Sequence, residues 1–243
     1  MRVAILSDIH GNLTAFEAVL ADLRQTSPDL ILHGGDLADG GSSPVDIVDR
    51  IRELGWPGVM GNTDEMLFRP ESLGEFARNA PALKPLFDVI EEMAAATRAK
   101  LGPEPLAWLS GLPRRQILEG IALVHASPES LWRAPSADAG DAELESVYAP
   151  PGRPVVVYGH IHRPYIRKLP GMVVVNSGSV GLTQDGDRRA SYILVDILAG
   201  EVTPSIRRVA YDLDRELALL AECGLPHAAW VAKTLQSGCF QIP

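Results

Sequence analysis

The chain has 243 residues, of which 46% are hydrophobic and 22% charged, and this profile excludes a disordered, collagen-like or coiled-coil protein. The 31 acidic residues outnumber the 22 Lys and Arg residues, and the formal charge of −9 argues against a broad surface for the phosphate backbone of nucleic acids. The apolar runs are too short to cross a bilayer. We therefore expect one domain over 1–243 with neither a nucleic-acid nor a membrane partner.

Cysteine usage and the first residues bear on the cellular compartment. Cys223 and Cys239 form no CxxC pair and match no zinc-ligand spacing, so we expect no disulfide framework. The segment 2–8 has the pattern of a buried strand and lacks the apolar core of a signal peptide. These features predict a cytoplasmic protein, and the sequence leaves the oligomeric state open.

The first sixty residues alternate short apolar runs with helical patterns. Strands are expected at 3–6, 30–32 and 59–60, and helices at 13–23 and 45–54. A βαβα beginning favours a parallel sheet with right-handed crossovers. The loops that follow its strands would then lie along one edge, where α/β proteins usually bind ligands.

The middle of the chain is expected to be helical and the later part rich in strands. We predict a helical insertion at about 65–113 that includes a helix over 83–101. A mobile loop is expected over 130–154, with room for a short helix near Leu144, and helices are expected after Leu213. The later strands are expected at 114–118, 121–124, 154–158, 165–169, 172–175, 191–197 and 204–209, the first two joined through Glu119-Gly120.

Polar residues of metal-ligand type follow the early strands, where each strand ends. Asp8-x-His10 follows the first strand, Asp36 the second and Asn62 the third. Each motif alone has an ordinary alternative, because Asp-x-His and Gly-Gly-Asp also form turns and Asn commonly caps helices. The recurrence at three successive strand ends is what favours a shared site.

Three histidines follow later strands in the same way. His125 comes directly after 121–124, and His160-x-His162 follows 154–158. A lone histidine after an apolar run is more often part of the core, and the paired motif is the stronger signal. Four of the six histidines lie at strand ends, which chance placement explains poorly.

Together these positions offer carboxylate, amide and imidazole groups without a thiolate, which suits Mn, Fe, Zn or Ni better than a structural zinc site. Seven side chains exceed the needs of one ion, but they suit two ions if one carboxylate bridges them. Two divalent ions roughly 3.5 to 4 Å apart can share a hydroxide that attacks phosphorus. The seven residues are Asp8, His10, Asp36, Asn62, His125, His160 and His162.

The order of these motifs resembles the calcineurin-like metallophosphoesterase superfamily, and the match runs from 3 to 162. Two later runs, 176–181 and 189–192, are similar to the small bacterial and archaeal phosphodiesterase branch of that superfamily. The resemblance implies a four-layer α/β/β/α sandwich, in which two mixed sheets pack face to face with helices outside.

The same resemblance implies how the seven side chains divide between two metal ions. The first ion would be held by Asp8, His10 and His162, and the second by Asn62, His125 and His160. Asp36 would bridge them, and catalysis would rest on Asp8, Asp36, Asn62 and His125. Two divalent cations are therefore the expected cofactors, with manganese expected first and Fe, Zn or Ni as alternatives.

Thr63 departs from one branch of the family, because protein-phosphatase-like members carry a histidine there that is thought to protonate the leaving oxygen. A threonine hydroxyl holds its proton too tightly for that role, so this departure argues against Ser/Thr phosphatase activity. Asn12, Thr63 and Arg163 are our candidates for contact with the substrate, and Ser127 and Ser179 lie in motif loops that could reach phosphate oxygens. We expect Asp64 to cap a helix.

These inferences predict a phosphodiesterase that hydrolyses a small phosphoester by attack of a hydroxide bridging two metals. The alternatives are a phosphomonoesterase, a dinucleoside polyphosphate hydrolase whose substrate is selected by the insertion at 65–113, and a non-catalytic scaffold of the same fold. A scaffold would be expected to lose ligands, and all seven are present. The sequence carries no signature of the physiological substrate.

Overall fold

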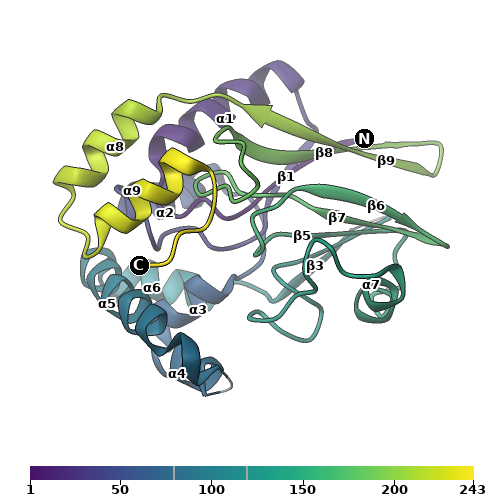
Figure 1. Ribbon diagram of the computed structural model, residues 1–243. Coiled ribbons are helices and arrows are strands. Elements are labelled where there is room, and N and C mark those ends of the chain that lie inside the picture. The colour runs from purple at the N-terminus through teal and green to yellow at the C-terminus, as the bar shows by residue number, and fades with distance from the viewer. Residues whose placement is uncertain (79, 119) are drawn as a thin grey trace.

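The computed structural model describes residues 1–78, 80–118 and 120–243. Two mixed β-sheets face each other, and helices cover their outer faces (Figure 1). The first sheet has the order β2-β1-β8-β9, in which β1 pairs in parallel with β2 and antiparallel with β8. Its strands are β1 (Arg2–Leu6), β2 (Leu30–His33), β8 (Ala190–Leu198) and β9 (Glu201–Val209).

The second sheet has the order β3-β4-β5-β7-β6. The central strands β4, β5 and β7 are parallel to one another, and each edge strand pairs antiparallel with its neighbour. Its strands are β3 (Arg115–Leu118), β4 (Ile121–Val124), β5 (Val155–Tyr158), β6 (Tyr165–Leu169) and β7 (Met172–Asn176).

The strand alternation divides each apolar run between two cores. Val3 and Ile5 of β1 point into the space between the sheets, where they join Leu123 and Val157 of the second sheet in one buried cluster. Neighbouring residues such as Leu6 face the other way, toward the outer helices. Since successive side chains point to opposite faces, a fully apolar strand is what a sheet covered on both sides requires.

The outer layers come from three helices. The helices α1 (Leu13–Thr26) and α2 (Pro44–Leu54) cover the first sheet, and α7 (Asp141–Tyr148) covers the second (Figure 1). In α1 the buried Phe16, Val19 and Leu23 recur at helical spacing and form the stripe that packs on the sheet. The expected four-layer sandwich is confirmed.

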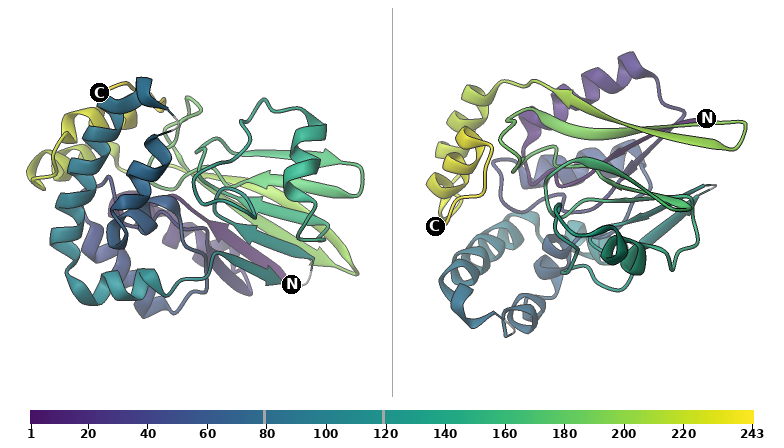
Figure 2. Two further views of the ribbon diagram at one scale, coloured as in Figure 1. Left: turned by 90° about the horizontal axis from the view of Figure 1, so that it is seen from below. Right: turned by 45° about the vertical axis from the view of Figure 1, so that its right-hand side comes forward.

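The remaining helices gather at the end of the sandwich where β1, β4 and β5 finish (Figure 1 and Figure 2). The segment between α2 and β3 supplies α3 (Asn62–Phe68), α4 (Glu71–Ala77), a short 3₁₀ helix (Pro81–Leu83), α5 (Lys84–Leu101) and α6 (Pro103–Ser110). The C-terminal part supplies α8 (Leu213–Glu222) and α9 (Ala228–Ser237). The predicted helical segment is therefore present, although it starts at Asn62, three residues earlier than expected.

One predicted strand is wrong. The segment 59–60 is not part of a sheet, and beside it only an isolated bridge joins His33 to Gly58. Pro57 lacks the N–H that a longer ladder would need, and the chain turns into α3 directly after Gly61.

The Glu119-Gly120 turn lies partly outside the described residues, since Glu119 is not described, but β3 and β4 do pair as a hairpin. Within the described part of the chain, no helix is both long and apolar enough to cross a membrane.

Candidate metal centre

The seven predicted ligands come together at one end of the sandwich. The loop after β1 carries Asp8 and His10, the loop after β2 carries Asp36, and the loops after β4 and β5 carry the three remaining histidines. Asn62 is the first residue of α3. Six of the seven residues are buried and His160 is half-buried. These polar groups therefore lie where water has little access.

The backbone is left-handed at most of these positions. Asp8, His10, Asp36, His160 and His162 have φ values of 56°, 49°, 54°, 65° and 55°. Residues with a Cβ seldom adopt this conformation, and such outliers are held only where the surrounding structure enforces them. The strain is concentrated on the residues whose side chains point into the shared space.

One group of side chains surrounds Asp8. His162 Nε2 lies 3.2 Å from Asp8 Oδ1 and 3.2 Å from His10 Nε2. His10 Nε2 lies 3.7 Å from Asp36 Oδ2. The ligand atoms of these four residues all lie within 4.8 Å of one another, a geometry that could hold a metal ion.

A second group surrounds Asn62. Its Oδ1 lies 2.9 Å from His125 Nε2 and 2.8 Å from His160 Nδ1. His125 Nε2 also lies 3.5 Å from Asp36 Oδ2. The same carboxylate oxygen of Asp36 therefore faces His10 of the first group and His125 of the second, and it connects the two groups.

Backbone carbonyls fix three of the imidazole rings. Each ring donates its Nδ1–H to a carbonyl oxygen, so Nε2 is the ring atom directed at the centre. This is the usual arrangement around metal-binding histidines, because it sets both the tautomer and the orientation of the ring. The pairs are His10 with Asp39 at 2.6 Å, His125 with Gly34 at 2.8 Å, and His162 with Leu182 at 2.5 Å.

Asp64 ties together the loops that carry Asp36 and Asn62. Its Oδ2 accepts hydrogen bonds from the backbone N–H groups of Gly61 at 2.9 Å and Asp36 at 2.8 Å, and its Oδ1 accepts one from Leu37 at 3.0 Å. The bond to Gly61 is the helix cap expected from the sequence. The two bonds to the Asp36 loop are long-range contacts that sequence reasoning missed.

Two glycines allow the backbone to approach the carboxylates closely. A Cβ added to Gly61 would lie 2.0 Å from Asp36 Oδ1, and one added to Gly159 would lie 2.2 Å from Asp8 Oδ2. Asp8 also accepts the His160 N–H at 3.1 Å in this crowded region. Any side chain larger than that of glycine at these two positions would therefore collide with the carboxylates.

The carboxylates are kept ionised although they are buried. Burial raises the pKa of Asp36, but the imidazoles of His125, His10 and His160 outweigh it and hold the pKa well below its usual range. For Asp8 the same contest between burial and His162 also lowers the pKa. Conversely, burial lowers the pKa of His125, and Asp36 and Asp8 raise it to about 9. The carboxylate of Asp8 likewise raises the pKa of His162, whereas burial lowers the pKa of His10 and of His160.

The predicted substrate contacts divide into one side chain at the centre and others that are engaged elsewhere. Thr63 donates its backbone N–H to Asp36 Oδ1 at 2.8 Å, and its buried hydroxyl has no hydrogen-bond partner among the described residues. The Asn12 amide caps α1 through Ala15 N–H and donates to a carbonyl at 3.0 Å, while the exposed Arg163 donates to the carbonyl of Gln184 at 3.0 Å.

The two serines of the motif loops are also engaged within the protein. Ser179 donates to the backbone oxygen of Asp8 at 2.6 Å, and Ser127 donates to the carbonyl of Ser130 at 3.4 Å. These bonds stabilise the loops around the centre. Of the five candidates, Thr63 alone lines the cavity beside the metal-ligand side chains.

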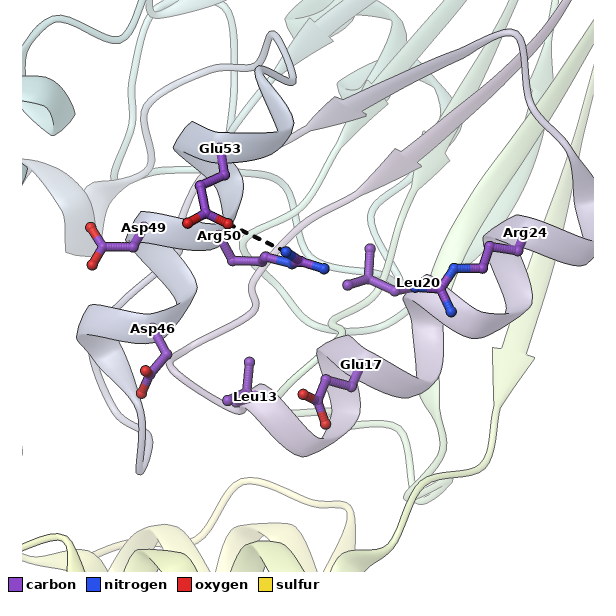
Figure 3. A pocket seen from close by; sticks show the side chains of 8 residues that line it. All are labelled: Leu13, Glu17, Leu20, Arg24, Asp46, Asp49, Arg50 and Glu53. Atoms are coloured by element: carbon purple, nitrogen blue, oxygen red, sulfur yellow. Dashed lines mark hydrogen bonds and ion pairs between the residues drawn. The ribbon is translucent and has the colours of Figure 1, made fainter.

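Two hollows differ in what surrounds them. One is a cavity of about 300 Å³ that opens directly onto His10, Asp36, Asn62, His160 and His162. The other lies between α1 and α2 and is lined by alternating charges (Figure 3). It contains none of the predicted ligands, and its Arg50 and Glu53 bind each other at 3.3 Å across one helical turn. The first hollow is therefore the one that adjoins the predicted metal ligands.

The chain is similar to known proteins over most of its length. A family model described as the calcineurin-like phosphoesterase superfamily domain matches residues 1–200. An uncharacterized protein from Methanocaldococcus jannaschii is 28% identical over 257 residues, which cover 97% of this chain and 98% of that protein. A crystal structure of a metallophosphoesterase from Sphaerobacter thermophilus is 29% identical, with a TM-score of 0.77 and coverage of 98% of this chain and 99% of that one. A hypothetical protein from Pyrococcus horikoshii OT3 is 20% identical, covers 99% of both chains and shares the fold with a TM-score of 0.84.

Proposed function

The chain belongs to the calcineurin-like phosphoesterase superfamily, a class of hydrolases that act on phosphoester bonds, and we propose that it is a phosphodiesterase with a dinuclear metal centre. The observation that carries this proposal is the position of Asp36 Oδ2. It lies 3.7 Å from His10 Nε2 and 3.5 Å from His125 Nε2, so one carboxylate oxygen serves both groups of side chains.

The residues fit a pair of divalent cations. Three imidazoles direct Nε2 atoms that backbone carbonyls have already oriented, and a divalent cation would take the place of any proton on them. Two ionised carboxylates supply the negative charge. Such oxygen and nitrogen donors suit first-row divalent ions, and we propose manganese, with Fe, Zn or Ni as alternatives. Asp8, His10 and His162 would hold one ion, Asn62, His125 and His160 the other, and Asp36 would be shared.

When bound, two divalent cations at such a site supply an activated water nucleophile and neutralise the phosphoryl oxygens. Hydrolysis then joins the water oxygen to phosphorus and breaks the bond from phosphorus to one ester oxygen, which leaves as an alcohol after it takes up a proton. The products are a phosphomonoester and that alcohol.

The chain's own residues position this reaction. Thr63 lines the cavity beside Asp36 and donates its backbone N–H to Asp36 Oδ1 at 2.8 Å. Its hydroxyl is buried from solvent. It cannot act as an effective acid, because the proton of an alcohol is held too tightly at neutral pH. The arrangement therefore favours esters whose leaving oxygen departs without strong acid assistance.

The test is hydrolysis by purified protein loaded with Mn²⁺, whose metal content is first measured by elemental analysis. We expect two metal ions per chain and faster turnover of bis(para-nitrophenyl) phosphate than of para-nitrophenyl phosphate. The variant Asp36→Asn should lose both the metals and the activity. Failure to hydrolyse either ester with two metals bound would refute the proposal.

Preference for the monoester in the same assay would instead favour a phosphomonoesterase. A dinucleoside polyphosphate hydrolase would be identified by its mononucleotide products, and a non-catalytic scaffold by Asp36→Asn leaving its cellular role unchanged. All seven ligand-type residues are retained in one site, which counts against a scaffold. We further propose a small phosphoester as the partner and a cytoplasmic setting, the latter supported by Cys223 and Cys239, which are both free thiols.

A further inference from the structure

The cavity of about 300 Å³ has a polar floor and apolar walls. The floor is made by five of the predicted metal ligands, and Asp39 and Thr63 lie beside them. The walls come from α3, α4, α5, α9, the loops after β4 and β7 and the C-terminal tail, and most of their side chains are apolar. A phosphoester placed at the centre would therefore direct one of its substituents toward these walls.

Aromatic rings form two separate groups in the wall. In the first group Phe76 stacks on Trp132, with ring centroids 5.3 Å apart, and meets the edge of Phe87 at 5.9 Å. In the second group Trp230 and Phe240 are packed edge to face at 6.1 Å. These rings supply a large apolar contact area with few rotatable bonds to order on binding.

The polar atoms of the indole rings are already engaged within the protein. Trp132 Nε1 donates to Glu65 Oε2 at 2.6 Å, and Trp230 Nε1 donates to the carbonyl of Gln241 at 2.7 Å. Glu65 is itself buried and also accepts from Arg69 at 2.9 Å, so the position of Trp132 is fixed. The indoles thus present only their apolar surfaces to the cavity.

The walls offer few hydrogen-bonding groups for a nucleoside. Among the described residues, no Lys or Arg lines this cavity, and apart from the five predicted ligands its polar side chains are those of Asp39, Thr63, Gln184 and Thr234. A purine, pyrimidine or ribose would have to leave its hydrogen-bonding groups unsatisfied there, which is costly. Aromatic rings can also attract a cation, but the Phe76 ring already faces the Arg133 guanidinium, whose central carbon lies 5.9 Å from its centroid.

We propose that the cavity binds a neutral hydrocarbon group of the substrate, so that the preferred substrate is a phosphodiester with one apolar substituent. The inference rests on the proposed phosphodiesterase function for its chemistry, and on the continuity of the cavity with the metal-ligand side chains for its location. Burial of the hydrocarbon removes apolar surface from water, which is the source of selectivity.

The test compares four para-nitrophenyl phosphodiesters whose second substituent is methyl, hexyl, thymidine or choline. Because each added methylene in an apolar pocket can be worth a factor of about 10, we expect kcat/KM for the hexyl ester to exceed that for the methyl ester at least about tenfold. A binding measurement accompanies it, in which hexylphosphonate and methylphosphonate are titrated calorimetrically into the Mn²⁺-loaded protein. Hexylphosphonate should bind about tenfold more tightly.

Variants of the wall locate the effect. Ile90→Ser and Phe240→Ser each replace an apolar group that lines the cavity, and each should lower the hexyl to methyl ratio in both measurements. Ile242→Ser is the matched control, because Ile242 lies in the same tail, is 85% exposed and does not line the cavity. The control should keep the ratio of the unmodified protein.

The outcomes separate this inference from the proposed function. Turnover of all four esters with equal kcat/KM, or preference for the thymidine or choline ester, would overturn the hydrocarbon cavity and leave the phosphodiesterase intact. Absence of all turnover with two metals bound would overturn the phosphodiesterase. In that case a preference for hexylphosphonate would still support the cavity, and equal binding of the two phosphonates would overturn it.

Discussion

The carboxylate of Asp64 connects the loops of the metal centre, and the variant Asp64→Asn tests how much that connection contributes. In the structure the carboxylate accepts three backbone N–H groups at 2.8, 2.9 and 3.0 Å, and the residue is fully buried. An amide of the same shape keeps one oxygen, which can still accept from Gly61 and Asp36. Its NH₂ group would then face the N–H of Leu37, so at least one of the three bonds is lost.

A hydrogen bond to a charged group contributes about 1.5–3 kcal/mol, and a buried donor without an acceptor adds a desolvation cost of about 1–3 kcal/mol. These two costs sum to about 2.5–6 kcal/mol, and the amide offsets part of them because it removes the buried charge whose burial raises the pKa of Asp64. We therefore expect Asp64→Asn to lower the free energy of unfolding by roughly 2–4 kcal/mol. Because Asp64 positions the Asp36 loop, the affinity for metal should also fall by about 10- to 100-fold, as it does when residues that support metal ligands are lost.

Both quantities can be measured on the same protein. Urea unfolding in the presence of chelator gives the stability, and calorimetric titration with Mn²⁺ gives the affinity. The pH should be kept well above 6, because burial and the neighbouring Asp36 raise the pKa of Asp64 to about 6 and the carboxylate must be ionised. Asp138→Asn makes the same charge change at an exposed site. If the two variants behave alike, Asp64 does not support the centre and the reasoning fails.

Three further outcomes follow from the same geometry. Gly61→Ala places a Cβ 2.0 Å from Asp36 Oδ1 and should abolish metal binding in elemental analysis, whereas Gly140→Ala, which meets nothing within 4 Å, should not. Protein at a metal concentration of 1,000 times Kd should gain about 4 kcal/mol of stability from binding, so chelation of the metals should remove this gain and lower the thermal midpoint. An unchanged midpoint would argue against binding by the folded state. Burial lowers the pKa of His33 from 6.5 to about 4, so this residue takes up a proton in the unfolded chain before it does so in the folded protein as the pH falls below 6.5. The free energy of unfolding should therefore drop by up to about 3 kcal/mol toward pH 4. In His33→Phe that part of the dependence should vanish, and its persistence in urea titrations across this range would assign it to other groups.

The fold was predictable because its signals are local. Fully apolar runs such as 155–158 are characteristic of strands covered on both faces, and the periodic apolar stripe of α1 identifies a helix that packs on a sheet. The segment 59–60 shows where a local signal fails, since two apolar residues between Pro57-Gly58 and Gly61 are too few to continue a ladder. The partition into two sheets came from family resemblance, because periodicity does not say which strands are neighbours.

The ligand-type residues were predictable for a related reason. Parallel strands finish at one edge of a sheet, so motifs far apart in sequence are brought together once the strands are assigned. Asp8-x-His10 and Asp36 follow the parallel strands β1 and β2 of the first sheet, and His125 and His160-x-His162 follow β4 and β5 of the second. The supporting contacts were not predictable. Nothing in the sequence indicates that Asp64 reaches the Leu37 N–H or that Glu65 accepts from Trp132, because these contacts depend on how α3 is placed against loops distant in the chain.

The two parts of the site are therefore built in different ways. The metal-ligand loops begin at the ends of β-strands and hold five residues in the left-handed backbone conformation, at a cost of about 1–3 kcal/mol each. The loops keep this conformation because the sheets and the hydrogen bonds of Asp64 fix them. The cavity walls come instead mostly from α4, α5, α9 and the tail, and elements so far apart in sequence contribute only one or a few side chains each. Substitutions in the walls can consequently alter which substituent is bound without moving the metal-ligand side chains. This separation explains why the sequence identifies the phosphoester chemistry and remains silent about the substrate.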